Sequence, residues 1–295
     1  MFSITTPNEK LAKPQIARAI LLALVACLAA PPAFAQSCDT PVGEPVEVAS
    51  LQPHFELKLA DGRLVRIAGI EPVRATQDNP DFPAKAAADL ELWSVGAQVA
   101  LTALDQTPDR WGRVRARVFL PPDNSAIARG LIEAGWARVD PLSETSACLP
   151  ALYQAEAEAR AQKRGLWADS AYAVLDQAEN PDFAGLGGRI VVVSGTVANV
   201  NTGRYRTFVN LGKDRRKSLT VTLSARTVHD FTTAGLAPQS LAGRTLRVRG
   251  LLDTRFGPRI EVYTPGAIEL LAGAAPAPAD AGWHAAIPAK PAENR

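Results

Sequence analysis

The stretch Val65-Arg66-Ile67-Ala68-Gly69-Ile70-Glu71-Pro72-Val73-Arg74 decides the fold of the first half of the chain. Apolar and charged side chains alternate along its first residues, and this period of two predicts a strand with one buried face. The dipeptide Asp61-Gly62 lies just before it, after a second alternating run over residues 55–60. Asp-Gly between two alternating runs is a strong signal for a β-hairpin. We therefore expect the stretch to leave a packed sheet and to present charged side chains where the sheet ends.

Further short runs surround this hairpin. We expect strands over residues 46–51, 55–60, 64–67, 98–104 and 114–120. Apolar residues at helical spacing predict helices over residues 85–93, 125–134 and 153–164. Five short strands with appended helices are typical of a Greek-key barrel of the OB type, which places the chain in a mainly β fold class with appended helices (α+β).

Several segments resemble, in order and spacing, those of staphylococcal-nuclease-like (thermonuclease, TNase-like) domains. They are Asp61-Gly62, Arg66-Ile67-Ala68-Gly69-Ile70, Asp109-Arg110-Trp111-Gly112-Arg113, the run over residues 130–137 and Gly165-Leu166-Trp167. A single match of this kind is weak evidence, but several in register are specific. The resemblance covers residues 46–168, and it implies an OB barrel with a site at the end of the stretch quoted above.

The resemblance also implies phosphodiester hydrolysis. The family uses a calcium ion held by two aspartates, a glutamate that positions water and two arginines that grip the phosphate. Arg66 and Arg113 match the two arginines, and Glu71 stands at the second aspartate. Phe55 stands at the first aspartate, and Arg74 stands at the glutamate. One protein carboxylate is a poor cage for Ca²⁺, which takes about six to eight oxygen ligands.

We therefore expect a catalytically impaired protein. Arg66, Glu71 and Arg113 are the catalytic candidates, Glu71 is the candidate metal ligand, and Ca²⁺ is expected as a cofactor only if the chain is active. Two alternatives stay open at this point. The two arginines could support the fold by pairing with Glu71 and Asp109. His54 could replace the missing ligand, although a histidine near a hairpin is more often a surface residue.

A second β-rich block follows a predicted linker over residues 169–187. Short strands are expected over residues 190–200, 207–211, 219–223, 246–252 and 260–262, with a helix over 226–234. This pattern predicts a second OB-like domain over residues 188–272. Residues 36–179 hold 14 Lys and Arg against 21 Asp and Glu, a balance of −7, whereas residues 180–272 hold 13 against 6, a balance of +7. A polyanion would be attracted first to the second domain.

Two basic runs flank one strand of this second block. Their residues are the candidates for binding nucleic acid: Arg204, Tyr205, Arg206, Lys213, Arg215, Arg216 and Lys217. Basic loops beside an aromatic side chain on an OB-like barrel suit a single-stranded polymer, because charge follows its backbone and rings stack on its bases. The alternative interpretation is a pair of ordinary solvated loops.

The first 35 residues read as an export signal, with a basic lead, an apolar core and a small-x-small cleavage site that ends at Ala35. The apolar core is too short to be a membrane span, so we expect no transmembrane segment in the mature chain. Leu24-Val25-Ala26-Cys27 resembles a lipobox, so a lipid anchor at Cys27 is the alternative to simple cleavage. Either way the protein is expected in the periplasm or secreted.

Export changes the interpretation of the two remaining cysteines. In an oxidising compartment Cys38 and Cys148 are expected to form a disulfide, since two thiols alone offer too few ligands for a metal. Residues 273–295 are rich in Ala and Pro and are expected to form a disordered tail.

Three functional hypotheses follow. The first is an exported, impaired thermonuclease-like protein that binds nucleic acid or another phosphate-bearing ligand. The second is an active metal-dependent phosphodiesterase in which Glu71 acts with Asp78 or Asp81. The third is a module that binds a protein or polymer of the cell envelope, as OB-like folds also do.

Overall fold

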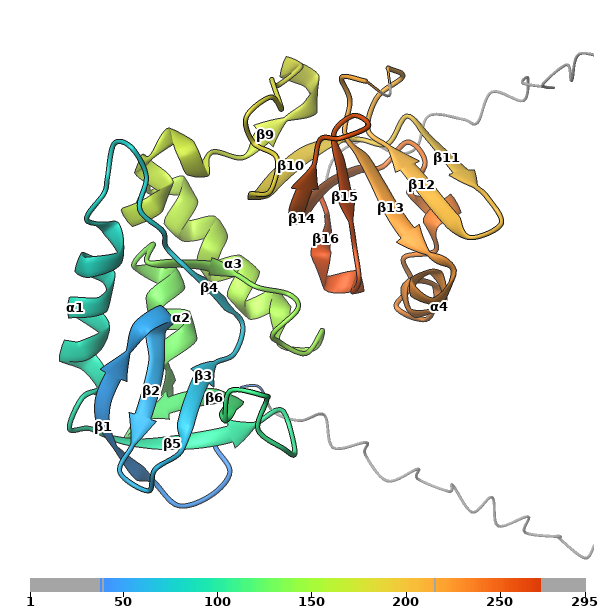
Figure 1. The fold of residues 1–295 in the computed structure, drawn as a ribbon. Helices are drawn as coiled ribbons and strands as arrows, with labels where there is room; N and C mark the ends of the chain where they lie inside the picture. Colours follow the sequence, from blue (N-terminus) through green and yellow to red (C-terminus); the bar gives the residue numbers. More distant parts are fainter. Residues whose placement is uncertain (1–37, 39, 215, 272–295) are drawn as a thin grey trace, which may run out of the picture. The chain divides into compact units, whose positions relative to one another are not determined.

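The computed structural model describes residues 38, 40–214 and 216–271 (Figure 1). The predicted export signal over residues 1–35, the lipobox cysteine Cys27, the loop residue Arg215 and the predicted tail over residues 273–295 lie outside the described residues. The described residues contain two hydrophobic cores, one in each half of the chain.

The first core fills a barrel of short strands. The strands are β1 (Val46–Gln52), β2 (Glu56–Leu59), β3 (Leu64–Ile67), β5 (Gln98–Ala103) and β6 (Arg113–Leu120). They are hydrogen-bonded in the order β3-β2-β1-β5-β6, and a parallel pairing of β3 with β6 closes the barrel. Val65 and Ile67 are buried while Arg66 between them is exposed, as the period-two pattern predicts.

The hairpin at Asp61-Gly62 sets the register of β2 and β3. Gly62 takes a positive φ of 92°, which favours glycine. The turn places Leu57 opposite Val65 and Glu56 opposite Arg66. A charged pair is thereby placed at the end of the hairpin that lies away from the turn.

Beyond β3 the chain leaves the barrel. Gly69, at a φ of 80°, turns the chain into β4 (Ile70–Pro72), which pairs antiparallel with β8 (Ala137–Val139). Glu71 lies opposite Arg138 in this pairing. The turn is held by two hydrogen bonds, from the Gly69 N–H to Ser143 Oγ and from the Asp140 N–H to the Gly69 carbonyl.

Helices cover this barrel close to the predicted positions. They are α1 (Phe82–Ser94), α2 (Ile127–Glu133) and α3 (Leu149–Ala161), with the short strand β7 (Ser125–Ala126) before α2. A proline stands in the first turn of both α1 and α3, where a missing N–H is tolerated, and both helices begin earlier than expected from apolar spacing.

The second core is covered by an eight-stranded sheet, and we call this β-rich block the second barrel. Its elements are β9 (Leu175–Asp176), β10 (Ile190–Thr196), β11 (Asn199–Thr202), β12 (Arg206–Asn210), β13 (Thr220–Ser224), α4 (Ala225–Thr233), β14 (Thr245–Asp253), β15 (Arg259–Glu261) and β16 (Ile268–Leu270). The order is β11-β12-β13-β15-β14-β10-β9, and β13 and β15 are parallel like β3 and β6. The predicted fold class, mainly β with appended helices and an OB-type barrel in the first half, is confirmed.

Several polar contacts join α3 to the second block. Arg249 on β14 donates two hydrogen bonds to the carboxylate of Glu156, at 2.9 and 2.8 Å, and both side chains are almost fully buried.

The predicted disulfide between Cys38 and Cys148 is present. Across the part of the chain that the structure describes, no helix is both long and apolar enough to span a membrane.

Candidate functional site

The predicted site residues of the first barrel line one cavity of about 950 Å³ at the end of β3, which we call the mouth. Its charged lining residues are Arg66, Arg74, Arg113, Glu56, Glu71 and Asp140, and His54 also lines it. Three arginines therefore face three carboxylates. Asp78 and Asp81, which the second hypothesis needs as metal ligands, are not among its lining residues.

Glu71, the candidate metal ligand, has both carboxylate oxygens in ion pairs. Its Oε2 accepts a hydrogen bond of 2.8 Å from Nη2 of Arg138, whose side chain is only 7% exposed. Its Oε1 lies 3.8 Å from Nη2 of Arg74. A metal ion at Glu71 would have to displace a buried guanidinium, which would then be left without its partner.

Arg113 is held by two carboxylates. Its guanidinium lies 2.6 Å from Glu56 Oε1 and 2.8 Å from Asp109 Oδ2. Hydrogen bonds to Asp109 and Glu56 raise the pKa of Arg113. Slight burial opposes the change at Asp109, but hydrogen bonds from Arg113 and from the backbone lower the pKa of Asp109 below its ordinary value. A phosphate would have to compete with these carboxylates for Arg113.

Arg66 and Arg74 are the more accessible cations of the mouth. The side chain of Arg66 is 46% exposed and pairs with Asp140, at 3.8 Å, and not with Glu71. The other pair of the fold-supporting alternative, Arg113 with Asp109, is present. Arg74 is 76% exposed, at the position where the resemblance led us to expect a water-orienting glutamate. These two guanidinium groups can therefore meet an anion at little cost.

Phe55 cannot take the part of the first metal aspartate. Its ring is buried in the first core, and both His54 and Phe55 have positive φ angles, of 63° and 62°. Such angles are rare for residues other than glycine. The strained turn η1 (Pro53–Phe55) thus turns an apolar ring inward at the position where a ligand oxygen is needed.

The mouth does not fit a calcium ion. Among the described residues, no group of three or more His, Cys, Asp or Glu side chains could hold a metal ion. Glu56 and Glu71 are each bound to an arginine. Since Ca²⁺ needs about six to eight free oxygen ligands, the donor set here is the wrong one.

The candidate nucleic-acid residues of the second barrel fall at opposite ends of β12. Arg204 and Tyr205 lie in the loop before this strand, Arg206 begins it, and Lys213, Arg216 and Lys217 lie in the loop after it. The ring of Tyr205 is 70% exposed, with the Arg204 guanidinium 5.1 Å from its centroid. Five residues of strand separate the loops, about 15 Å of chain, so they bound one sheet face rather than form a single patch.

A cavity of about 630 Å³ borders that sheet face and is also lined by Glu71, Asp140 and Leu142, which line the mouth as well. Phe208 on β12 and the exposed ring of Tyr263 line it, together with Arg206, Arg255 and Arg259. Arg206 pairs with Glu261 at 3.3 Å, and Arg259 pairs with Asp253 at 2.6 Å. Arginines beside aromatic rings on the face of a β-sheet suit an oligonucleotide, whose backbone meets the charges and whose bases stack on the rings.

Sequence reasoning missed three charged residues of this region. Glu56 could have been found, because counting back from the Asp61-Gly62 turn places it opposite Arg66. Arg138 and Asp140 gave no such signal. Their neighbourhood with Glu71 and Arg66 depends on the pairing of β4 with β8, two short strands that are far apart in the sequence.

Residues 63–169 match the family described as "Staphylococcal nuclease homologue". This match lies within residues 46–168, apart from its last residue, and includes the whole stretch from Val65 to Arg74. A search of curated proteins found no match. The family suggests a nuclease-like or nucleic-acid-related function. The recognition made from the motifs is confirmed: this chain carries a domain of the staphylococcal nuclease family.

Proposed function

We propose that this protein binds single-stranded nucleic acid and has lost the calcium-dependent cleavage of its family. The observation that carries the proposal is the ion pair between Glu71 and the buried Arg138, which occupies the one carboxylate retained at a metal-binding position. With Phe55 turned into the core and Arg74 in place of a carboxylate, the mouth offers cations without a metal cage.

Binding is assigned chiefly to the second barrel. Its excess of basic residues, the exposed Tyr205 and Tyr263, and Arg206 beside Phe208 support contact with a charged strand that carries rings. Stacking on exposed aromatic side chains stabilises such complexes by about 1–3 kcal/mol per base. The mouth contributes through Arg66 and Arg74, which are not buried in ion pairs.

We also propose that the protein works outside the cytoplasm. The disulfide between Cys38 and Cys148 supports this location, because disulfides persist in oxidising compartments and are rare in the cytosol. The export signal proposed for residues 1–35 would provide the route.

Fluorescence anisotropy with a labelled single-stranded DNA tests the binding, together with a cleavage assay in Ca²⁺ or Mg²⁺. We expect binding that weakens as salt rises from about 50 to 200 mM, because counterions are released on binding. We expect no metal-stimulated cleavage. Arg206→Ala should weaken binding several-fold, and Arg66→Ala should weaken it less.

The control is Arg129→Ala, which removes an exposed arginine on α2, outside the second barrel and outside the lining of the mouth. Cleavage that requires Ca²⁺ and disappears in Arg113→Ala would favour an active phosphodiesterase instead. Binding that is absent, or indifferent to salt, would favour the module for an envelope protein or polymer.

A further inference from the structure

A third cavity, of about 330 Å³, lies beside Glu71. It shares Glu71, Arg74, Ala75 and Ile190 with the mouth, and its other lining residues do not line the mouth. Neither Arg66 nor Arg113 lines it. Its cations are Arg74, Arg138 and Arg189, and Glu71 is the sole carboxylate among its described lining residues. The lining therefore carries a positive charge that its own carboxylate does not neutralise.

Arg138 is fixed in this cavity. Nη2 donates to Glu71 at 2.8 Å and to the carbonyl of Ile190 at 3.1 Å, and the guanidinium lies 5.1 Å from the ring centroid of Tyr172. Those two bonds are the ones that its guanidinium makes to described residues, so Nη1 and Nε keep free donors. A guanidinium held on one edge presents its other donors in a rigid fork, which suits a phosphate.

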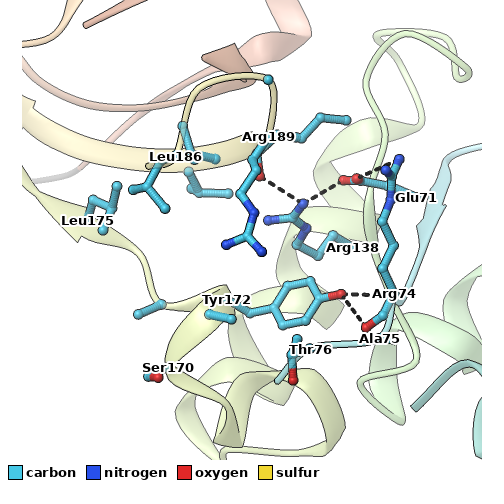
Figure 2. A pocket seen from close by; sticks show the side chains of 16 residues that line it. Glu71, Arg74, Ala75, Thr76, Arg138, Ser170, Tyr172, Leu175, Leu186 and Arg189 are labelled. Atoms are coloured by element: carbon cyan, nitrogen blue, oxygen red, sulfur yellow. Dashed lines mark hydrogen bonds and ion pairs between the residues drawn. The ribbon is translucent and has the colours of Figure 1, made fainter. Parts of the chain in front are cut away.

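Arg189 lines the same cavity as Arg138. Figure 2 shows the Arg189 side chain extending toward Arg138 and the ring of Tyr172. Among the described residues the Arg189 guanidinium has no hydrogen-bond or ion-pair partner, although it shares the cavity with two other arginines. The guanidinium groups of Arg138 and Arg189 point toward each other, and Glu71, the one carboxylate among the described lining residues, is already paired. Such an arrangement of positive charge favours the binding of an anion between the two arginines.

The remaining lining of the cavity is mostly apolar, with Thr76 and Ser170 as its polar side chains. Leu175, Leu186, Ile190 and the ring of Tyr172 belong to it. The Tyr172 hydroxyl accepts a hydrogen bond from the Arg74 N–H at 2.7 Å and donates one to the Arg74 carbonyl at 3.1 Å. Burial raises the pKa of Tyr172, so the hydroxyl stays neutral at physiological pH. A volume near 300 Å³ is at the small end of ligand pockets and suits a single nucleotide rather than a polymer.

We propose that this cavity is a binding site for a phosphate monoester with a ring-bearing organic part, such as a nucleoside monophosphate. The phosphate contacts the guanidinium groups of Arg138 and Arg189, and the organic part packs against Leu175 and Leu186. The site shares Glu71, Arg74 and Ile190 with the mouth, but the two arginines that hold the phosphate, Arg138 and Arg189, do not line the mouth. The proposal therefore does not require the function proposed above.

Calorimetric titration of the full chain with adenosine monophosphate, inorganic phosphate and adenosine tests the site. We expect one site that binds the monophosphate more tightly than phosphate and binds adenosine hardly at all. Arg189→Gln should lower the affinity for the monophosphate about 10- to 100-fold, the effect of losing a charge-assisted hydrogen-bonding group. Leu186→Ala should lower the affinity for the monophosphate and leave the affinity for inorganic phosphate unchanged.

Arg226→Gln is the matched control, since it removes the same charge from an exposed position on α4 and should leave every affinity unchanged. Arg189 is chosen over Arg138 because loss of Arg138 would leave Glu71 unpaired and could unfold the region. The proposal is overturned if the monophosphate does not bind, if Arg189→Gln and Arg226→Gln weaken it equally, or if adenosine binds equally well. Equal affinity for phosphate and the monophosphate would exclude the apolar contact. Arg66→Ala should leave this site intact, which separates its failure from failure of the proposed DNA binding.

Discussion

Glu156 is a carboxylate kept inside the protein by a charged partner. Its side chain is 1% exposed, and it accepts hydrogen bonds from Arg249 and from the Val139 N–H. Burial by itself raises the pKa of a carboxyl, but the charge and hydrogen bonds of Arg249 outweigh it and lower the pKa of Glu156. In the unfolded chain the same group has an ordinary pKa of about 4.3. The protonation of one side chain is therefore coupled to folding.

The sign of this coupling predicts acid lability. A depressed folded-state pKa contributes stability that is complete above the unfolded pKa and is lost as pH falls toward the folded one. We expect the free energy of unfolding from Glu156 to be constant above about pH 5 and to decline below it. Glu156→Gln should cost up to about 3–5 kcal/mol at pH 7, because among the described residues it leaves the buried Arg249 with Glu269, at 3.0 Å, as its one charge partner, and it should flatten the decline.

Urea unfolding followed by circular dichroism between pH 3.5 and 7 measures both effects. Glu158→Gln is the control, an exposed carboxylate on the same helix. A Glu156→Gln variant with the same acid slope as the parent protein would contradict the assignment.

At the scale of elements, α2 ends in a turn at Gly135, and this turn packs directly on the turn at Gly165 that follows α3. Gly135 has a φ of 75°, and hydrogen bonds run from its N–H to the Ile132 carbonyl and from the Trp136 N–H to the Leu131 carbonyl. This pattern is a Schellman motif. The Gly135 carbonyl then accepts from the Leu166 N–H at 2.9 Å, so the end of α2 is tied to the segment that follows α3.

We predict that Gly135→Ala destabilises the first barrel more than a comparable change elsewhere. A Cβ at Gly135 would overlap the backbone carbonyl of Arg164 in addition to straining the backbone. Strain of this kind costs about 1–3 kcal/mol by itself. Gly96→Ala is the matched control, since Gly96 has a φ of 78° with open space around its missing Cβ. Thermal unfolding measures the two losses, and equal losses would show that the overlap relaxes freely.

At the scale of the whole molecule, the disulfide closes a long loop. Cys38 and Cys148 are 110 residues apart, so the bond restrains the unfolded chain across the first barrel. In the chain-entropy account a loop of that length gains about 5 kcal/mol. We predict that dithiothreitol lowers the free energy of unfolding by up to that amount, measured by guanidinium titration. The Cys38→Ser/Cys148→Ser double variant should respond to the reductant not at all, and an unchanged parent protein would contradict the prediction.

Much of the fold was predictable because its signals are local. Period-two alternation, the Asp61-Gly62 turn and the glycines at helix ends act over a few residues, so they can be recognised without knowing what lies across the barrel. The motif positions of Arg66, Glu71 and Arg113 were predictable on the same ground. The early starts of α1 and α3 were missed because their first-turn prolines read as loop.

The sequence by itself determined a staphylococcal-nuclease-like barrel followed by a basic β-rich block, and it predicted that Phe55 and Arg74 stand where the family carries carboxylates. Only the tertiary structure decided what the remaining groups can do. It pairs Glu71 with the buried Arg138, Arg113 with Glu56, and turns Arg189 toward Arg138 in a separate cavity. The physical reason is distance along the chain. An ion pair between remote residues depends on which strands pair and in what register, and alternation within one strand carries no information about its partner.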